Sequence, residues 1–215
     1  GTPKPVRLLK RDMEASARLT NDFFDITCRS VMLLCLSPDY IAGKMMIVRA
    51  LLSGADLLVV TPSSLPLTTI DEPIDFAAMV PAQVVESLKS TMQKSRLSRI
   101  TSLIIGGAPL SPGTEVELEK LPVDMYATYG MTETVSHVAL RRIGDSLSLY
   151  CALGGISFSI DERNCLIIHA PHFSVKEFVT NDVVELVDSR NFRWIGRYDL
   201  SLIHISEPTR LGMIS

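Results

Sequence analysis

Short apolar runs alternate with amphipathic segments over residues 1–142. The runs have the length of buried strands and lie at 30–36, 56–60, 102–105 and 125–129. Helices are expected at 6–24, 40–52, 81–94 and 111–121: apolar residues recur at helical spacing in 40–52 and 81–94, while 111–121 begins with Ser111 as N-cap and Pro112 at the first helical position. A Pro-rich loop is expected before residue 81. Strands that alternate with helices predict an α/β fold, with a mostly parallel sheet flanked by helices.

The pattern changes after Arg142. Residues 155–171 form two alternating segments around a turn, which is typical of a β-hairpin, and two further strands are indicated at 178–188 and 192–199. We therefore expect an α/β subdomain over 1–142, incomplete at its N-terminus, followed by a small antiparallel, barrel-like subdomain over 143–199.

The last residues differ from the rest of the chain. Leu200 to Arg210 read LSLIHISEPTR, which is similar to the translation of a widely used transposase-based sequencing adapter. We expect residues 200–215 to be an adapter-derived tail rather than native protein. The chain also begins at Gly1 without an initiator Met, so we expect it to be a piece of a longer protein.

Composition excludes several kinds of partner. The 215 residues have a net charge of -3, which favours neither nucleic acid nor an anionic membrane surface as a partner. No apolar run approaches the roughly 20 residues that span a bilayer. The four cysteines form no C-x-x-C pair, which favours reduced thiols in a cytoplasmic protein. Self-association into a homo-oligomer is left open by the sequence.

The stretch 124–137, DMYATYGMTETVSH, places polar side chains at the end of a buried strand. Thr132, Glu133 and Thr134 supply two hydroxyls and a carboxylate where open α/β sheets bind ligands. An alternative interpretation is a helix that begins here with Thr132 as its N-cap.

Four short motifs follow one another along the chain. They are GTPK (1–4), GGAP (106–109), YGMTE (129–133) and the pair TND (180–182) and GRYD (196–199). In this order and spacing they resemble the adenylate-forming enzymes, the superfamily of acyl-CoA synthetases and luciferases. The resemblance implies that a carboxylic acid is joined to the α-phosphate of ATP with Mg²⁺, and that coenzyme A then attacks the acyl-adenylate.

The resemblance also implies roles on the phosphate side of the nucleotide. Gly1 and Lys4 would end a phosphate-binding loop, with Lys4 as a catalytic cation. Glu133 would be the Mg²⁺ ligand, since Mg²⁺ usually takes one or two carboxylates together with phosphates. Thr132 would hydrogen-bond the α-phosphate.

On the nucleoside side, Tyr129 would pack against adenine. Asp182 and Arg197 would hold the ribose hydroxyls. The motif at 180–182 reads TND where the family commonly has TGD, so Asn181 departs from the pattern and Asp182 keeps it. The turn beside the adenine would consist of Gly106, Gly107 and Ala108.

The sequence that surrounds these motifs resembles that of the branch of the family that activates o-succinylbenzoate, an aromatic dicarboxylic acid of menaquinone biosynthesis. A dianionic acid requires a cation in its pocket, and Lys44 and Arg49 lie on the helix that lines the acyl pocket in this family. The alternative is that both are solvated surface charges. His137 is a further candidate for the acid pocket.

Two other functions remain open. One is a different acyl- or aryl-CoA ligase or an adenylation domain, which would have no need of Lys44 or Arg49. The other is a nucleotide-binding module without catalysis. Because the resemblance implies missing segments at both ends, we expect the chain alone to be inactive as a ligase.

Overall fold

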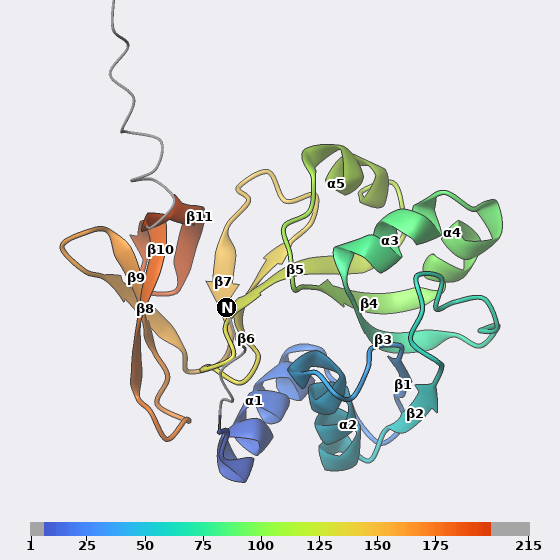
Figure 1. The fold of residues 1–215 in the computed structure, drawn as a ribbon, viewed down its shortest axis with the longest axis horizontal. Coiled ribbons are helices and arrows are strands. Elements are labelled where there is room, and N and C mark those ends of the chain that lie inside the picture. Colours follow the sequence, from blue (N-terminus) through green and yellow to red (C-terminus); the bar gives the residue numbers. More distant parts are fainter. Residues whose placement is uncertain (1–6, 199–215) are drawn as a thin grey trace, which may run out of the picture.

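The computed structural model describes residues 7–198. The predictions for Gly1, Lys4 and the tail at 200–215, and the last residue of the GRYD motif, lie outside these residues. Within 7–198 the strands form one 11-stranded sheet in the order β2-β1-β3-β4-β5-β6-β7-β11-β10-β9-β8 (Figure 1).

The bounds of the elements agree in most places with the hydrophobic pattern. The strands are β1 (Val31–Leu34), β2 (Asp56–Val59), β3 (Ile74–Met79), β4 (Ile100–Ile105), β5 (Asp124–Gly130), β6 (His137–Arg142), β7 (Tyr150–Ala152), β8 (Ser157–Ile160), β9 (Cys165–His169), β10 (Glu177–Asp188) and β11 (Asn191–Arg197). The helices are α1 (Lys10–Phe23), α2 (Ile41–Ser53), α3 (Pro81–Leu88), α4 (Thr91–Leu97) and α5 (Pro112–Leu118). None of the helices formed by residues 7–198 combines the length and apolar character that a bilayer crossing requires.

Strands β2, β1, β3, β4 and β5 are parallel, as the alternation of strands and helices predicts. Helices α1 and α2 cover one face of this part of the sheet, and α3, α4 and α5 cover the other (Figure 1). Successive strand residues therefore enter different cores: Met32 packs with the α1 and α2 side, and Leu33 packs with the α3 to α5 side. Burial on both faces explains why these strands are continuous apolar runs.

Two predictions about the parallel part are wrong. The segment expected to be a Pro-rich loop contains β3, whose small residues Ala77 and Ala78 have weak strand propensity but fit a strand buried on both faces. The single helix expected over 81–94 is two helices, because Ser90 adopts an extended conformation and its hydroxyl caps a new helix by accepting from the Gln93 N–H.

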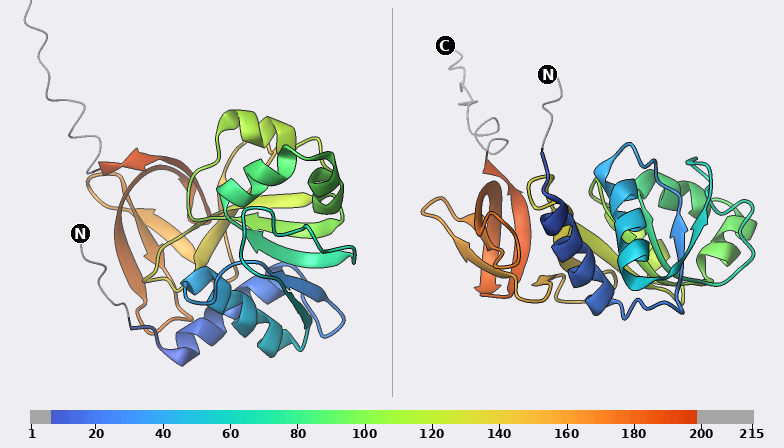
Figure 2. Two further views of the ribbon diagram at one scale, coloured as in Figure 1. Left: turned by 45° about the vertical axis from the view of Figure 1, so that its right-hand side comes forward. Right: turned by 90° about the horizontal axis from the view of Figure 1, so that it is seen from below.

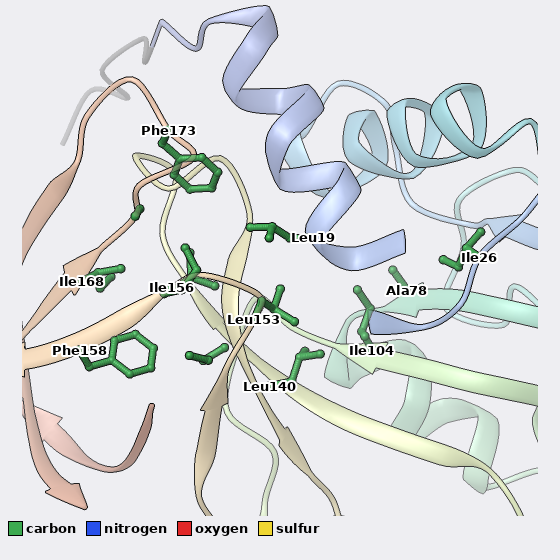
Figure 3. Close-up of a cluster of buried hydrophobic side chains, with 14 of the residues drawn as sticks. Leu19, Ile26, Ala78, Ile104, Leu140, Leu153, Ile156, Phe158, Ile168 and Phe173 are labelled. Atoms are coloured by element: carbon green, nitrogen blue, oxygen red, sulfur yellow. The ribbon is translucent and has the colours of Figure 1, made fainter. Parts of the chain in front are cut away.

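From β6 onward every strand pairing is antiparallel. The strands β8 to β11 curve away from the parallel part, and α1 lies between the two (Figure 2). One apolar cluster nevertheless runs through both parts, from Leu19 of α1 and Ile104 of β4 to Phe158 and Ile168 (Figure 3). The antiparallel half is confirmed, while the division into subdomains at residue 142 stays a prediction.

Phe192 holds the antiparallel strands against β5. It is fully buried, stacks on Tyr150 at 5.4 Å between ring centroids, and meets Tyr129 and Phe158 edge-on at 5.0 and 4.9 Å. These contacts join rings from β5, β7, β8 and β11. The packing of this ring therefore sets where β11 lies relative to the end of β5.

Replacing Phe192 with Ala is expected to lower the free energy of unfolding by about 3–5 kcal/mol, because a buried ring is removed and a cavity remains. Denaturant unfolding followed by circular dichroism measures this change. Ile195→Ala, on the same strand but 62% exposed, is the matched control and should change stability by less than about 0.5 kcal/mol. Equal losses in both variants would contradict the role given to Phe192.

Candidate active site

Two cavities meet at the carboxyl ends of β4 and β5. The larger cavity has a volume of about 590 Å³ and lies between the turn after β4 and strands β5, β6, β7 and β11. The smaller cavity has a volume of about 290 Å³ and lies between α2, the ends of β3 to β5, and the turn before β6. Three residues line both cavities, namely Gly107, Thr128 and Gly130.

Glycines allow the backbone to approach closely at this meeting point. A Cβ atom on Gly106 would lie 2.3 Å from the Thr128 hydroxyl oxygen, and one on Gly130 would lie 2.3 Å from the Ser136 carbonyl oxygen. Gly107 has a φ of +90°, which side chains disfavour. A side chain at any of these positions would disturb the wall between the cavities. Ala108 follows in the same turn and lines the larger cavity.

The oxygen-rich stretch after β5 is a tight turn and not a helix, so the interpretation of Thr132 as a helix N-cap is wrong. The Val135 N–H donates to the Thr132 carbonyl at 3.0 Å. The buried Thr134 hydroxyl oxygen accepts from the Met131 N–H at 3.0 Å and lies 2.8 Å from the Ser136 carbonyl oxygen, so it can donate there. Val135 has a φ of +66°, an unfavourable value for a β-branched residue. The chain then returns as β6.

This turn leaves Thr132 and Glu133 exposed, and only Thr132 of the two lines a cavity, the smaller one. Residues 7–198 contain no group of three or more His, Cys, Asp or Glu side chains placed to hold a metal ion. A metal at Glu133 would therefore need further ligands from a bound phosphate or from water, which is the usual coordination of Mg²⁺.

Aromatic and charged side chains from distant segments form the wall of the larger cavity. Tyr129 donates a hydrogen bond from its hydroxyl to Asp182 at 2.7 Å, and burial together with that carboxylate raises the pKa of Tyr129. Asp182 also lies 3.8 Å from Nε of Arg197. The structure thus brings Tyr129, Asp182 and Arg197 together; Tyr129 lines the cavity, and the other two are not among its lining residues.

Several aromatic and charged side chains that line this cavity were not predicted from the sequence, among them Arg141, Tyr150 and Trp194. Arg141 makes a bidentate ion pair with Glu115 at 2.6 and 3.0 Å, and Tyr150 and Trp194 line the cavity beside it. Their positions depend on the pairing of β7 with β6 and β11, which no local motif encodes. The one signal available was Trp194 itself, since it is the chain's single tryptophan and stands two residues before the GRYD motif.

Arg49 lines the smaller cavity and is 1% exposed. Its guanidinium donates to the Ser136 hydroxyl at 3.0 Å and contacts the Met46 sulfur at 3.7 Å, while Nε has no partner. Among residues 7–198, no carboxylate pairs with it. Burial lowers the pKa of Arg49 to about 9, which leaves the group charged at neutral pH.

The structure separates Lys44 from Arg49. Lys44 is exposed, donates to the Asp39 carbonyl at 2.8 Å, and lines neither cavity. His137 lines the smaller cavity and is buried beside Arg49. Burial, and then the nearby guanidinium, lower the pKa of His137 well below 6.5. The smaller cavity therefore holds one buried cation next to a neutral imidazole.

A family model described as AMP-binding enzyme matches residues 1–156. The match covers more than half of the 215 residues, so the chain belongs to the AMP-binding enzyme family. This membership confirms the resemblance of the ordered motifs to adenylate-forming enzymes.

Individual relatives agree with the family. A 2-succinylbenzoate–CoA ligase of Enterococcus faecalis is 27% identical over 149 residues, which is 68% of this chain and 31% of that protein. An acyl-CoA synthetase (AMP-forming)/AMP-acid ligase II-like protein of Dyadobacter fermentans is 37% identical, with a TM-score of 0.85 over 93% of this chain and 57% of that chain. The predicted fold class is thereby confirmed.

The fold is also that of the o-succinylbenzoate coenzyme A synthetase of Bacillus subtilis, solved in complex with ATP and magnesium ion. That structure is 17% identical, with a TM-score of 0.78 over 93% of this chain and 48% of that chain. This chain spans less than two thirds of the length of each of these three relatives.

Replacing His137 with Gln is expected to change how stability depends on pH. The unfolded chain takes up a proton on His137 near pH 6.5, whereas the folded chain does so only at much lower pH. The free energy of unfolding therefore falls as the pH drops below 6.5, by up to about 1.4 kcal/mol per pH unit from this group. Denaturant unfolding between pH 7.5 and pH 5 measures the slope, which His137→Gln should reduce.

His172→Gln is the control, because His172 is exposed. That variant should keep the slope of the wild type. Identical slopes for all three proteins would contradict a neutral, buried His137.

Proposed function

We propose that this chain is part of an ATP-dependent acid–thiol ligase. The protein would activate o-succinylbenzoate, in menaquinone biosynthesis, first to an acyl-adenylate and then to a coenzyme A thioester. One observation carries the proposal: two cavities meet at Gly107, Thr128 and Gly130, and the smaller one holds the buried, uncompensated guanidinium of Arg49. Joining a carboxylate to a phosphate requires adjacent sites for two anions.

The larger cavity is proposed as the nucleotide site. Its lining supports adenine beside Gly107, Ala108 and Tyr129, while Gly106 in the same turn lets the Thr128 side chain of β5 approach closely. Asp182 and Arg197, next to Tyr129, would hold the ribose, since a carboxylate accepts and a guanidinium donates hydrogen bonds.

The exposed turn after β5 is proposed to face the phosphates. Thr132 can donate a hydrogen bond there, and Glu133 can supply a carboxylate to Mg²⁺, whose charge would offset that of the phosphate oxygens. Gly1 and Lys4 keep the phosphate-binding role that the family implies. The protein's own contribution at this end is positioning: the close contact of Gly130 with the Ser136 backbone fixes the turn that holds both side chains.

The smaller cavity is proposed as the acid site, with Arg49 binding the second carboxylate of the substrate. A buried cation with no counter-ion is costly unless a ligand completes the pair. His137 would serve this site as a neutral neighbour. The likeness to a 2-succinylbenzoate–CoA ligase supports the choice of acid. Lys44, exposed and bonded to a backbone carbonyl, is the weaker candidate.

Two alternatives predict different behaviour. Another acyl- or aryl-CoA ligase would bind monocarboxylates in the smaller cavity and would gain nothing from Arg49. A nucleotide-binding module without catalysis would bind ATP and no acid. The buried guanidinium favours the dicarboxylate ligase over both.

Replacing Glu133 with Gln is expected to remove the effect of Mg²⁺ on ATP binding. Trp194 is the chain's single tryptophan and lines the larger cavity, so its fluorescence should report nucleotide binding directly. In the wild type, Mg²⁺ should tighten ATP binding by about tenfold, equivalent to about 1.4 kcal/mol. Glu133→Gln should abolish this gain and leave AMP binding unchanged.

Glu162→Gln, in the exposed turn between β8 and β9, is the matched control and should behave as the wild type. A Trp194 signal that does not respond to any adenine nucleotide would refute the proposed nucleotide site. A response that keeps its Mg²⁺ dependence in Glu133→Gln would refute the metal role alone.

Replacing Arg49 with Gln is expected to weaken the binding of 2-succinylbenzoate roughly 10- to 100-fold, because a charge-assisted hydrogen bond is worth about 1.5–3 kcal/mol. Binding of benzoate, which lacks the second carboxylate, should change by less than twofold. Isothermal titration calorimetry measures both. Lys44→Gln is the control, because it removes a cation from the same helix outside the cavity, and it should leave both affinities unchanged. If Lys44→Gln alone lowered the affinity for 2-succinylbenzoate, Lys44 rather than Arg49 would be the group that binds the second carboxylate.

A further inference from the structure

A line of hydrogen-bonded side chains runs behind the smaller cavity, from α1 to Arg49. The Thr20 hydroxyl oxygen lies 3.2 Å from Nε2 of His137. The other ring nitrogen, Nδ1, lies 3.3 Å from the Ser136 hydroxyl oxygen. That hydroxyl oxygen accepts from Nη2 of Arg49 at 3.0 Å. The four side chains come from α1, α2, β6 and the turn before β6.

The hydrogens along this line can be assigned, because one arrangement satisfies every bond. The Thr20 hydroxyl donates to the Ser16 carbonyl at 3.3 Å, so it accepts from His137, whose proton must be on Nε2. Nδ1 is then an acceptor, and the Ser136 hydroxyl donates to it. The lone pairs of that hydroxyl are left free for the Arg49 N–H. A proton on Nδ1 instead would break the bond from Thr20 to the helix backbone.

Helix α1 is itself fixed against the rest of the molecule. Near its C-terminus, the Asn21 side-chain amide donates to the Arg49 carbonyl at 3.0 Å, which ties α1 to α2. Near its N-terminus, Asp12 accepts from the Ser174 N–H at 2.8 Å and from its hydroxyl at 2.7 Å. Arg11 donates to the same hydroxyl at 2.6 Å. A helix held at both ends can serve as a rigid support for a side chain that it carries.

We propose that Thr20 is a positioning residue for the acid site, which acts through His137 and Ser136 to orient the guanidinium of Arg49 toward the smaller cavity. The inference rests on the proposed function, in that Arg49 is the group that recognises a carboxylate. Thr20 itself does not line either cavity. Preference for a dicarboxylic acid would therefore depend on a helix that does not touch the acid.

Three variants test this role. Thr20→Val removes the hydroxyl and keeps the side-chain shape, while Thr20→Ser restores the hydroxyl. Ser16→Ala is the matched control, because the Ser16 hydroxyl is buried on the same helix and has no hydrogen-bond partner. Two measurements are made on each: the affinities for 2-succinylbenzoate and benzoate, and the NMR signals of the Arg49 Nε–H and of the His137 ring nitrogens.

Thr20→Val is expected to weaken the binding of 2-succinylbenzoate about tenfold and the binding of benzoate less than twofold. It should also shift the NMR signal of the Arg49 Nε–H and lower the share of His137 rings that carry their proton on Nε2. Thr20→Ser and Ser16→Ala should match the wild type in all of these. Unchanged Arg49 and His137 signals in Thr20→Val would overturn the proposal, as would equal effects of Ser16→Ala.

The NMR signals separate this inference from the proposed function. If the wild type binds neither acid, the proposed function fails, and the Arg49 and His137 signals still decide whether Thr20 controls them. If 2-succinylbenzoate binds as tightly to Thr20→Val as to the wild type, the positioning role fails and the acid site stands.

Discussion

At the carboxyl ends of β4 and β5 the chain converges so closely that a Cβ atom on Gly106 would meet the Thr128 hydroxyl, and one on Gly130 would meet the backbone at Ser136. The arrangement of the site follows from this convergence. Because β4 and β5 end close together, Thr128 lines both cavities, as do Gly107 and Gly130. Because Gly130 lies against the backbone at Ser136, the chain must reverse within a few residues, which forces Val135 to a positive φ and leaves Thr132 and Glu133 exposed. Backbone strain at such a point is typical of functional sites.

The second constraint is electrostatic. A guanidinium that is 1% exposed and has no carboxylate among residues 7–198 costs stability, and the structure offsets part of that cost with hydroxyl and sulfur contacts. His137 fits this setting only as a neutral ring, since a second positive charge beside Arg49 would be repelled. The same network that makes the cation tolerable without a ligand also fixes where it points. Stability and recognition of an anion are thus properties of one set of contacts.

Much of this arrangement was predictable from the sequence, and the limits have physical causes. The parallel strands were found because burial on both faces produces continuous apolar runs, and the polar groups after β5 were found because their motif is contiguous. Strand β3 was missed since Ala77 and Ala78 give little hydrophobic signal, and the split between α3 and α4 was missed because it depends on the cap formed by Ser90. The wall made by Arg141, Tyr150 and Trp194 depends on antiparallel register, and the difference between Lys44 and Arg49 depends on which side of α2 packs inward. Neither is encoded in local spacing.

The central claim is that the two cavities are adjoining parts of one site, one for the nucleotide and one for the acid. The most direct test is the affinity of an adenosine sulfamate that carries a 2-succinylbenzoyl group, compared with the affinities of AMP and 2-succinylbenzoate measured separately by calorimetry. If the cavities adjoin as described, the linked molecule occupies both at once and should bind at least about 100-fold more tightly than AMP, since the second contact becomes intramolecular. A linked molecule that binds no more tightly than AMP would contradict the account.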